Sequence, residues 1–378
     1  FILPKQNARE AAVVNNLKVY GVENIKEVIE FFNNERNLEP SIVNTREEFY
    51  EHQSSFPYDF ADVKGQESVK RALEVAASGG HNLIMIGSPG SGKSMMAKCM
   101  PSILPPLSLG ESLETTKIHS IAGKLGKDSS LIAIRPFRSP HHTISQVAMV
   151  GGGTNPQPGE ISLAHNGLLF LDELPEFNRS VLEVLRQPLE DRYISISRAK
   201  YSLDYPASFM LVASMNPCPC GYYNHPTRAC VCNPGQVQRY LNRISGPLLD
   251  RIDIQIEIVP VPFEKMAEQH HAESSASIRK RVIKARKIQA QRFANHPGIY
   301  CNAQMEAGLL HLYAQPNEAG LKLLQTAMTR LNLSARAYGR ILKVARTIAD
   351  LDNSEHITSI HLAEAISYRN LDREDWAG

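Results

Sequence analysis

The sequence predicts an α/β fold in three layers, with a parallel sheet between helices, and a smaller all-α domain after it. Short apolar runs, each expected to be a buried strand, alternate with helical patterns in the middle of the chain. This alternation is typical of a parallel sheet that is covered on both faces. The runs are residues 83–86, 167–171, 209–213 and 254–259. After residue 262 the apolar residues recur only at helical spacing, so we expect helices alone there.

The chain has 378 residues, of which 43% are hydrophobic and 21% charged, a composition typical of a globular protein with more than one domain. The formal net charge is +2, so a surface for nucleic acid would have to be local. No apolar run approaches the roughly 20 residues of a membrane span, and no signal peptide is visible. We therefore expect a cytoplasmic protein with no membrane partner. The chain opens at Phe1 without a methionine, and we expect a piece of a longer protein.

The sequence divides into four expected segments. Residues 1–36 hold too few apolar residues for an independent core, and residues 37–59 are polar and interrupted by prolines, as in a linker. Residues 60–261 contain the buried strands, and residues 262–378 form the helical domain. Within the third segment, the Gly- and Pro-rich residues 136–165 are too long for a plain loop and predict an inserted hairpin or functional loop.

Periodicity places the remaining elements. Apolar residues at helical spacing predict helices over 66–77, 180–188, 274–294, 318–328, 335–350 and 358–369. Residues 193–203 alternate in polarity and predict a strand pair with its turn near Arg198 and Lys200. The helix over 274–294 is strongly basic, and two interpretations stay open: a solvated face, or a surface that follows the phosphates of a nucleic acid.

A glycine-rich segment lies between the first buried strand and a helix, and it fits the pattern G-x-x-x-x-G-K-[ST] of a phosphate-binding loop. Its glycines let backbone N–H groups turn toward a polyphosphate, and the helix N-terminus adds a partial positive charge. We expect Lys93 to reach the β- and γ-phosphates of ATP and the Ser94 hydroxyl to bind Mg²⁺. The expected nucleotide-binding residues are Gly87, Ser88, Pro89, Gly90, Ser91, Gly92, Lys93, Ser94 and Met95.

Two carboxylates end the next buried strand. Asp172 can hold the water shell of Mg²⁺, and Glu173 can polarise an attacking water, which indicates hydrolysis rather than nucleotide binding alone. Asn216 ends the following strand and is well placed to orient the lytic water. The sequence therefore predicts a hydrolytic site in which the catalytic candidates are Lys93, Asp172, Glu173 and Asn216.

Four of the six cysteines lie close together in a polar segment. Cys218, Cys220, Cys230 and Cys232 form two C-x-C pairs, which could close a tetrahedral thiolate shell around Zn²⁺. Since C-x-C is a less usual spacing than C-x-x-C, the alternative is four reduced cysteines in a loop. His141 and His142 also adjoin each other, but without Cys or acidic neighbours we expect surface loop residues there rather than metal ligands.

Together these motifs resemble the AAA+ ATPases, and within them the YifB/ComM family of the magnesium-chelatase-like group. The most specific segments are residues 135–142, 167–173, 215–221 and 244–253. The resemblance implies an AAA+ P-loop three-layer sandwich with a C-terminal helical lid domain. Residues 3–10 resemble the tail of the Lon-like (S5-type) domain at the N-terminus of this family, so residues 1–36 are interpreted as its remnant.

The resemblance also implies roles by position. Asn216 would be sensor 1, and Arg251 would be an arginine finger that completes the site of a neighbouring subunit. Arg336 would be sensor 2, with Arg340 as a weaker candidate. For Arg251 a structural alternative stays open, namely an ion pair with one of the aspartates beside it. The implied assembly is a hexameric ring of copies of the chain.

Two hairpins would face the pore of that ring, and they supply the candidate DNA contacts. The strand pair with Arg198 and Lys200 would be the pre-sensor-1 hairpin, and the insertion that contains Arg138 would be the second. The implied function is an ATPase motor that remodels single-stranded or branched DNA, as a helicase or in branch migration during recombination or transformation. The alternatives are a magnesium-chelatase-type motor subunit and a remodeller of a protein partner.

Overall fold

The computed structural model describes residues 1–12, 17–41, 49, 53, 55–126, 131–153, 156–198, 201–261, 272–331 and 333–369. Contacts divide the chain into two compact units. Unit 1 comprises Phe1–Ser55 and Pro106–Arg135, and unit 2 comprises Phe56–Pro105 and Pro136–Gly378. The contacts thus group the chain differently from the division by sequence, because residues 106–135 cluster with the N-terminal segment and the lid helices cluster with the sheet.

A five-stranded parallel sheet forms the centre of unit 2, with the strand order β11-β3-β10-β7-β4. The strands are β3 (Leu83–Gly87), β4 (Phe137–Arg138), β7 (Leu168–Leu171), β10 (Met210–Met215) and β11 (Ile254–Ile258). Val212 of β10 lies opposite Leu83 of β3 and Phe170 of β7. Since all neighbours in the sheet run parallel, the carboxyl ends of β3, β7 and β10 meet at one edge.

The sheet is covered on both faces, as the sequence predicts. Successive side chains of a strand point to opposite faces; accordingly Leu83 and Met85 join one apolar cluster, while Ile84 and Ile86 join another. The first cluster includes residues of α4 (Glu67–Gly79), α5 (Lys93–Ile103), α14 (Ser275–Arg292) and α17 (Ala335–Leu351). The second includes residues of α7 (Gln146–Val150), α8 (Glu160–Leu163) and α9 (Arg179–Glu183). The predicted α/β fold is therefore confirmed.

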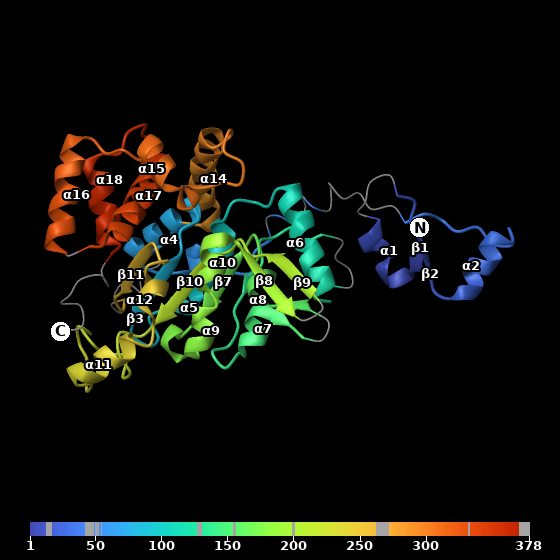
Figure 1. Ribbon diagram of the computed structural model, residues 1–378, viewed down its shortest axis with the longest axis horizontal. Helices are drawn as coiled ribbons and strands as arrows, with labels where there is room; N and C mark the ends of the chain where they lie inside the picture. Colours follow the sequence, from blue (N-terminus) through green and yellow to red (C-terminus); the bar gives the residue numbers. More distant parts are fainter. Residues whose placement is uncertain are drawn as a thin grey trace. The chain divides into compact units, whose positions relative to one another are not determined.

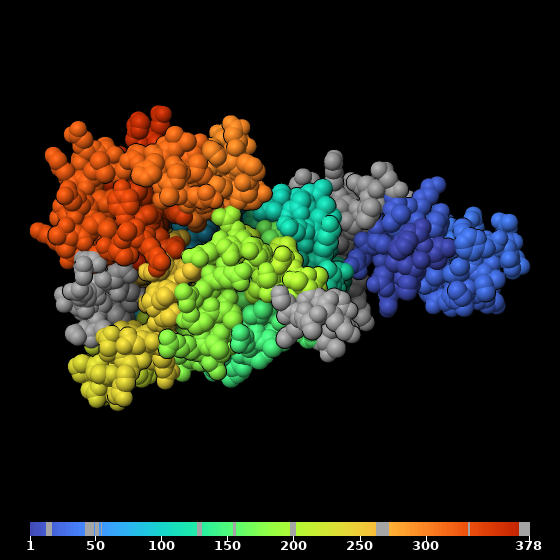
Figure 2. All heavy atoms as spheres, in the orientation of Figure 1, coloured from blue at the N-terminus to red at the C-terminus, as the bar shows by residue number. Residues whose placement is uncertain are grey.

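The carboxyl-terminal part of unit 2 is helical, and its helices form one continuous body (orange to red in Figures 1 and 2). Besides α14 and α17 they are α15 (Ala307–Tyr313), α16 (Glu318–Arg330) and α18 (Ser359–Ser367). A buried carboxylate ties this domain to the sheet: Asp253, just before β11, forms ion pairs with Arg340 of α17 and His81 before β3. Burial favours the neutral acid, but Arg340 and His81 nevertheless hold the pKa of Asp253 well below its usual range.

Shorter elements complete unit 2. The strand pair expected over 193–203 is present as β8 (Tyr193–Arg198) and β9 (Tyr201–Pro206), which run antiparallel. Within the insertion, β5 (Gly151–Gly152) and β6 (Gln157–Pro158) form a second small hairpin. The remaining helices are α10 (Arg186–Asp191), α11 (Pro234–Leu241) and α12 (Gly246–Leu249), and 3₁₀ turns lie at Phe60–Asp62, Leu174–Glu176 and Asn302–Gln304.

Unit 1 has a small core of its own. The parallel strands β1 (Ile2–Pro4) and β2 (Tyr20–Val22) lie with α1 (Lys5–Ala11), α2 (Ile25–Phe32) and α6 (Leu109–Ile121). Ala8, Ala12 and Val19 form one small apolar cluster in this unit. Among the described residues of the whole chain, no helix combines the length and the apolar character that crossing a membrane requires.

Candidate functional site

The phosphate-binding loop connects β3 to α5, as the motif requires. Gly90 and Gly92 have φ angles of +77° and +90°, a region that glycine adopts without the steric cost of a side chain. A Cβ on Gly87 would lie 2.8 Å from the carbonyl oxygen of Ile258, so glycine is required there by close packing. The Ser91 hydroxyl is buried and has no hydrogen-bond partner among the described residues. An unpartnered donor inside such a loop suits an anionic ligand.

Lys93 begins α5 and points back into the loop. Its ammonium group donates to two loop carbonyl oxygens, at 2.7 and 2.9 Å, and to Oδ1 of Asn216 at 3.2 Å. Burial lowers the pKa of Lys93, while Asp172 and Glu173 oppose that shift. The structure therefore brings together the lysine of β3–α5, the carboxylates after β7 and the asparagine after β10.

Asp172 occupies the centre of this group. Its Oδ2 accepts a hydrogen bond from the Ser94 hydroxyl at 2.6 Å, and its Oδ1 accepts one from the buried hydroxyl of Ser214 on β10. Sequence reasoning did not find Ser214. The available signal was a polar residue inside an otherwise apolar strand, two positions before Asn216.

Glu173 has a φ of +55°, a left-handed conformation that non-glycine residues adopt infrequently and that occurs preferentially at functional sites. Its backbone N–H donates to Oδ1 of Asp172 at 3.1 Å, and its side chain is half-exposed. The Nδ1 of His142 lies 3.6 Å from Oε2 of Glu173, and the imidazole also packs edge-on against Phe177. Sequence analysis assigned His142 to a surface loop, but the structure places it beside the candidate base.

These groups fit ATP and Mg²⁺. Mg²⁺ takes oxygen ligands at about 2.0–2.1 Å in an octahedron, and the adjacent oxygens of Ser94 and Asp172 are such donors. Lys93, the unpartnered Ser91 hydroxyl and the backbone of the glycine loop supply donors for phosphate oxygens. Met95 follows in the first turn of α5 and is partly exposed.

Arg251 lies just after α12, and its side chain is only 12% exposed. Its Nη2 forms an ion pair of 2.6 Å with Glu190 of α10, and its other nitrogens donate to the carbonyl oxygens of Arg186 and Pro247. The partner is thus Glu190, rather than either of the aspartates beside Arg251 that sequence analysis considered. The guanidinium is held within its own chain in this structure.

Arg336 opens α17 and is 70% exposed, and its Nη1 donates to Oδ2 of Asp250 at 2.8 Å. Asp250 is the direct neighbour of Arg251 in the chain. The sensor 2 candidate therefore binds the partly buried carboxylate of the residue that precedes the finger candidate in the chain. Arg340, the weaker sensor 2 candidate, is used in the buried ion pair with Asp253.

The candidate DNA contacts have different surroundings. Arg138 on β4 forms a bidentate ion pair with Glu160, at 2.6 and 2.7 Å, so its charge is compensated within the chain. Arg198 is the last residue of β8 and pairs with Tyr201 in the ladder, while Lys200 lies outside the described residues. On the basic helix α14, the arginines largely bind neighbouring helices, as in the ion pairs of Arg281 with Glu74 and of Arg292 with Asp350.

The four clustered cysteines converge. Their sulfur atoms all lie within 4.8 Å of one another, and the separations from Cys218 to Cys220 and Cys230 are 3.3 and 3.7 Å. A tetrahedral shell with Zn–S bonds of about 2.3 Å has S···S edges of about 3.8 Å, close to these values. Burial disfavours the thiolate of Cys220, but hydrogen bonds from the backbone of Tyr222 and Val231 lower its pKa to about 6. Burial raises the pKa values of Cys230 and Cys232. The cluster can therefore hold a soft metal ion.

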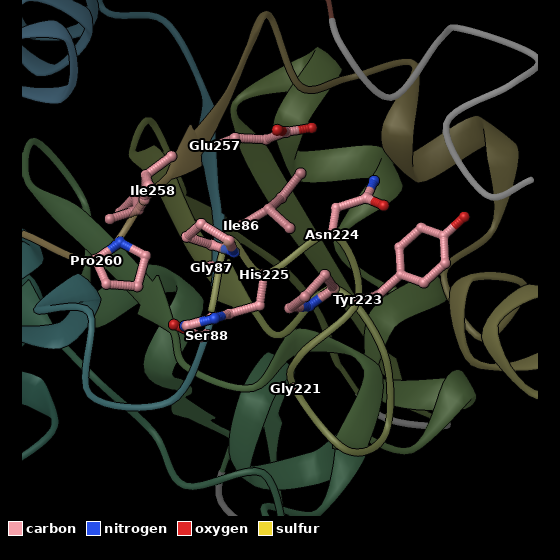
Figure 3. A pocket seen from close by; sticks show the side chains of 13 residues that line it. Ile86, Gly87, Ser88, Gly221, Tyr223, Asn224, His225, Glu257, Ile258 and Pro260 are labelled. Atoms are coloured by element: carbon pink, nitrogen blue, oxygen red, sulfur yellow. The ribbon is translucent and has the colours of Figure 1, made fainter. Parts of the chain in front are cut away.

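A pocket lies beside the base of the phosphate loop (Figure 3). Ile258 and Pro260 at the end of β11 line one side of it, and Tyr223 and Asn224 of the cysteine-containing segment line the other. Gly87 of the loop lies between them. The segment after β10 thus reaches the phosphate loop directly.

The fold and this site define a P-loop protein of the AAA+ type. The family model described as "Magnesium chelatase, subunit ChlI" matches residues 59–266, and its C-terminal counterpart matches residues 272–369. The chain belongs to the YifB/ComM family of magnesium-chelatase-like AAA+ proteins, as its resemblance in sequence implied. Membership of this family implies ATP and Mg²⁺.

Individual relatives cover most of the chain. It is 42% identical to the "Competence protein ComM" of Haemophilus influenzae over 373 residues, which cover 98% of this chain and 72% of that protein. It is 43% identical to YifB of Escherichia coli over 376 residues, 98% of this chain and 71% of that protein. The "Magnesium-chelatase 38 kDa subunit" of Rhodobacter capsulatus is 25% identical over 179 residues, 42% of this chain and 50% of that protein.

Proposed function

We propose that the chain is the subunit of a ring-shaped ATPase motor that remodels DNA. The proposal rests on one observation above all: an assembled phosphate-loop, carboxylate and asparagine site in a chain that is similar along nearly its whole length to a protein named for competence. Competence involves DNA, and the hairpin β8–β9 supplies Arg198 and Lys200 as candidate contacts. Because Arg138 is paired with Glu160, the β8–β9 hairpin carries this part of the proposal.

The residues of the site have distinct tasks. Lys93 and the loop bind the phosphates, Ser94 and Asp172 hold the magnesium ion, and Glu173 takes a proton from the attacking water. Asn216 orients the water, and its contact with Lys93 keeps it beside the phosphates. Bound Mg²⁺ neutralises charge on the phosphates. Arg251 acts as an arginine finger on the site of a neighbouring subunit, and Arg336 is sensor 2. The assembly that we propose is a hexamer.

The test is the rate of ATP hydrolysis without DNA and with single-stranded, double-stranded and branched DNA. We expect branched or single-stranded DNA to raise the rate, and the effect to weaken steeply between roughly 50 and 200 mM salt because the contacts are to phosphates. Arg198→Ala/Lys200→Ala should lose the stimulation and keep the basal rate. Arg179→Ala, which removes an exposed arginine of α9, is the matched control and should keep both.

A rate that no DNA changes would contradict the DNA-remodelling proposal and favour a second candidate. This second candidate is a motor subunit for tetrapyrrole metallation, which the match to the magnesium-chelatase family suggests. Its subunits would hydrolyse ATP in the same site without responding to DNA.

We also propose that the cysteine cluster binds zinc. All four sulfur atoms lie within 4.8 Å of one another, and Cys218, Cys220 and Cys230 have separations close to the edge of a tetrahedral thiolate shell. Zinc is the metal that such a shell commonly holds. Protein purified without chelator should contain about one zinc per chain, and Cys218→Ser/Cys220→Ser should lose it. Metal analysis by mass spectrometry checks this, and a folded, active, metal-free preparation would contradict it.

A further inference from the structure

The cysteine-containing segment packs against the phosphate loop. We call residues 217–233, between β10 and α11, the Cys loop. Gly221 in this loop has a φ of +84°, and a Cβ there would lie 2.5 Å from Cδ of Pro89 in the phosphate loop. The same Cβ would lie 3.9 Å from Cγ of Asn216. The backbone at one position of the Cys loop therefore adjoins both the phosphate loop and the asparagine that contacts Lys93.

Asn216 is fixed from the same side. Its side chain accepts the hydrogen bond from Lys93, and the chain continues from it directly into the Cys loop. Two residues after Asn216 the chain reaches Cys218, which is fully buried. Whatever holds the Cys loop in place therefore also holds Asn216.

The four cysteines stand at the two ends of the Cys loop. Cys218 and Cys220 come directly before Gly221, and Cys230 and Cys232 come directly before α11. A metal bound by all four would cross-link these ends and fix the position of Gly221 against Pro89. The backbone hydrogen bond from Gly221 to the carbonyl oxygen of Cys218, at 3.0 Å, would transmit the constraint directly.

We propose that the metal of the Cys loop is a clamp on the ATP site: by holding Gly221 against Pro89 it sets the positions of Asn216 and the phosphate loop for hydrolysis. This inference rests on the proposed zinc site and is independent of DNA. Lys93, Ser94 and Asp172 have contacts outside the Cys loop, so nucleotide binding depends on the clamp less than hydrolysis does. A displaced Asn216 would reduce the rate because catalysis is sensitive to misplacement of about 1 Å.

A pair of glycine variants tests the clamp. Gly221 and Gly298 both have a φ of +84°, but a Cβ on Gly298 would meet no atom within 4 Å, so Gly298→Ala reproduces the backbone strain without the clash. Zinc content, binding of a fluorescent ATP analogue and basal ATP hydrolysis are measured without DNA. We expect Gly221→Ala to keep its zinc and bind the analogue, yet to lose hydrolysis by about tenfold to a hundredfold. Gly298→Ala should match the parent in all three.

A second variant tests the clamp by removing two of the proposed metal ligands. Cys230→Ser/Cys232→Ser leaves Asn216, Cys218 and Gly221 unchanged. We expect this variant to lose zinc and to show a loss of hydrolysis rate similar to that of Gly221→Ala. Parental hydrolysis in Gly221→Ala, or in the zinc-free cysteine variant, would overturn the clamp. If the cysteine variant does not fold, hydrolysis by the parent after removal of zinc with a chelator takes its place. A response to DNA has no part in these measurements, so failure of the DNA-remodelling proposal and failure of the clamp are distinguishable.

Discussion

Glu173→Gln should bind ATP like the parent and lose hydrolysis by about 10²–10⁴-fold, the contribution of a positioned general base. The substitution removes the proposed proton acceptor and leaves in place the contacts of Lys93 with the phosphate loop and the pair of Ser94 and Asp172. The glutamine amide also preserves a polar group 3.6 Å from the His142 ring. Steady-state hydrolysis and equilibrium binding of a fluorescent ATP analogue separate the two effects.

Two further variants serve as comparisons for this experiment. Lys93→Ala should lose binding or turnover, because it removes the cation of the phosphate loop. Glu176→Gln changes a carboxylate only three positions from Glu173 that forms an exposed ion pair with Arg243, and it should hydrolyse ATP at the parental rate. A parental rate in Glu173→Gln would show that another group accepts the proton.

The sheet and the centre of the site could be predicted because their signals are local in the sequence. An apolar run without polar interruptions predicts a strand that is buried on both faces. The structure agrees, since Leu83 and Met85 pack in one apolar cluster and Ile84 and Ile86 in the other. The phosphate loop and the carboxylates at strand ends follow from spacing, since parallel strands bring their carboxyl ends to one edge.

Contacts made by the tertiary structure could not be predicted in this way. His142 and Glu173 are far apart in the sequence, and only the order of β4 beside β7 in the sheet brings them within 3.6 Å. Arg138 lies in a specific motif, but its pairing with Glu160 depends on how the insertion folds back. The contact of Gly221 with Pro89 likewise depends on the path of a loop that has little regular structure.

The sequence and the structure suggest different roles for Arg251. The family resemblance implies a finger for the neighbouring subunit, whereas the structure holds the guanidinium on Glu190 of the same chain. If the residue is a finger, it must leave Glu190 in the assembled ring. If it only anchors α10, removing either partner of the pair should have the same effect.

We expect Arg251→Ala to keep nucleotide affinity and to lose hydrolysis by about 10³-fold or more, the range for an arginine finger. Glu190→Ala should retain most of the activity, because it releases the arginine without removing it. Arg186→Ala, which removes an exposed arginine of the same helix that pairs with Glu183, should match the parent. Equal losses in Arg251→Ala and Glu190→Ala would assign Arg251 to structure alone.

Mixing subunits then shows whether the finger acts in trans. Lys93→Ala chains have no working phosphate loop but still offer Arg251, and Arg251→Ala chains have a working loop but no finger. An interface contains a complete site where the phosphate loop comes from an Arg251→Ala chain and the finger comes from a Lys93→Ala chain. A mixture should therefore recover part of the activity that each variant lacks alone. Light scattering checks that mixed rings form. Co-assembled mixtures that remain inactive would exclude a finger in trans, because every such ring contains interfaces with all the groups that the site requires.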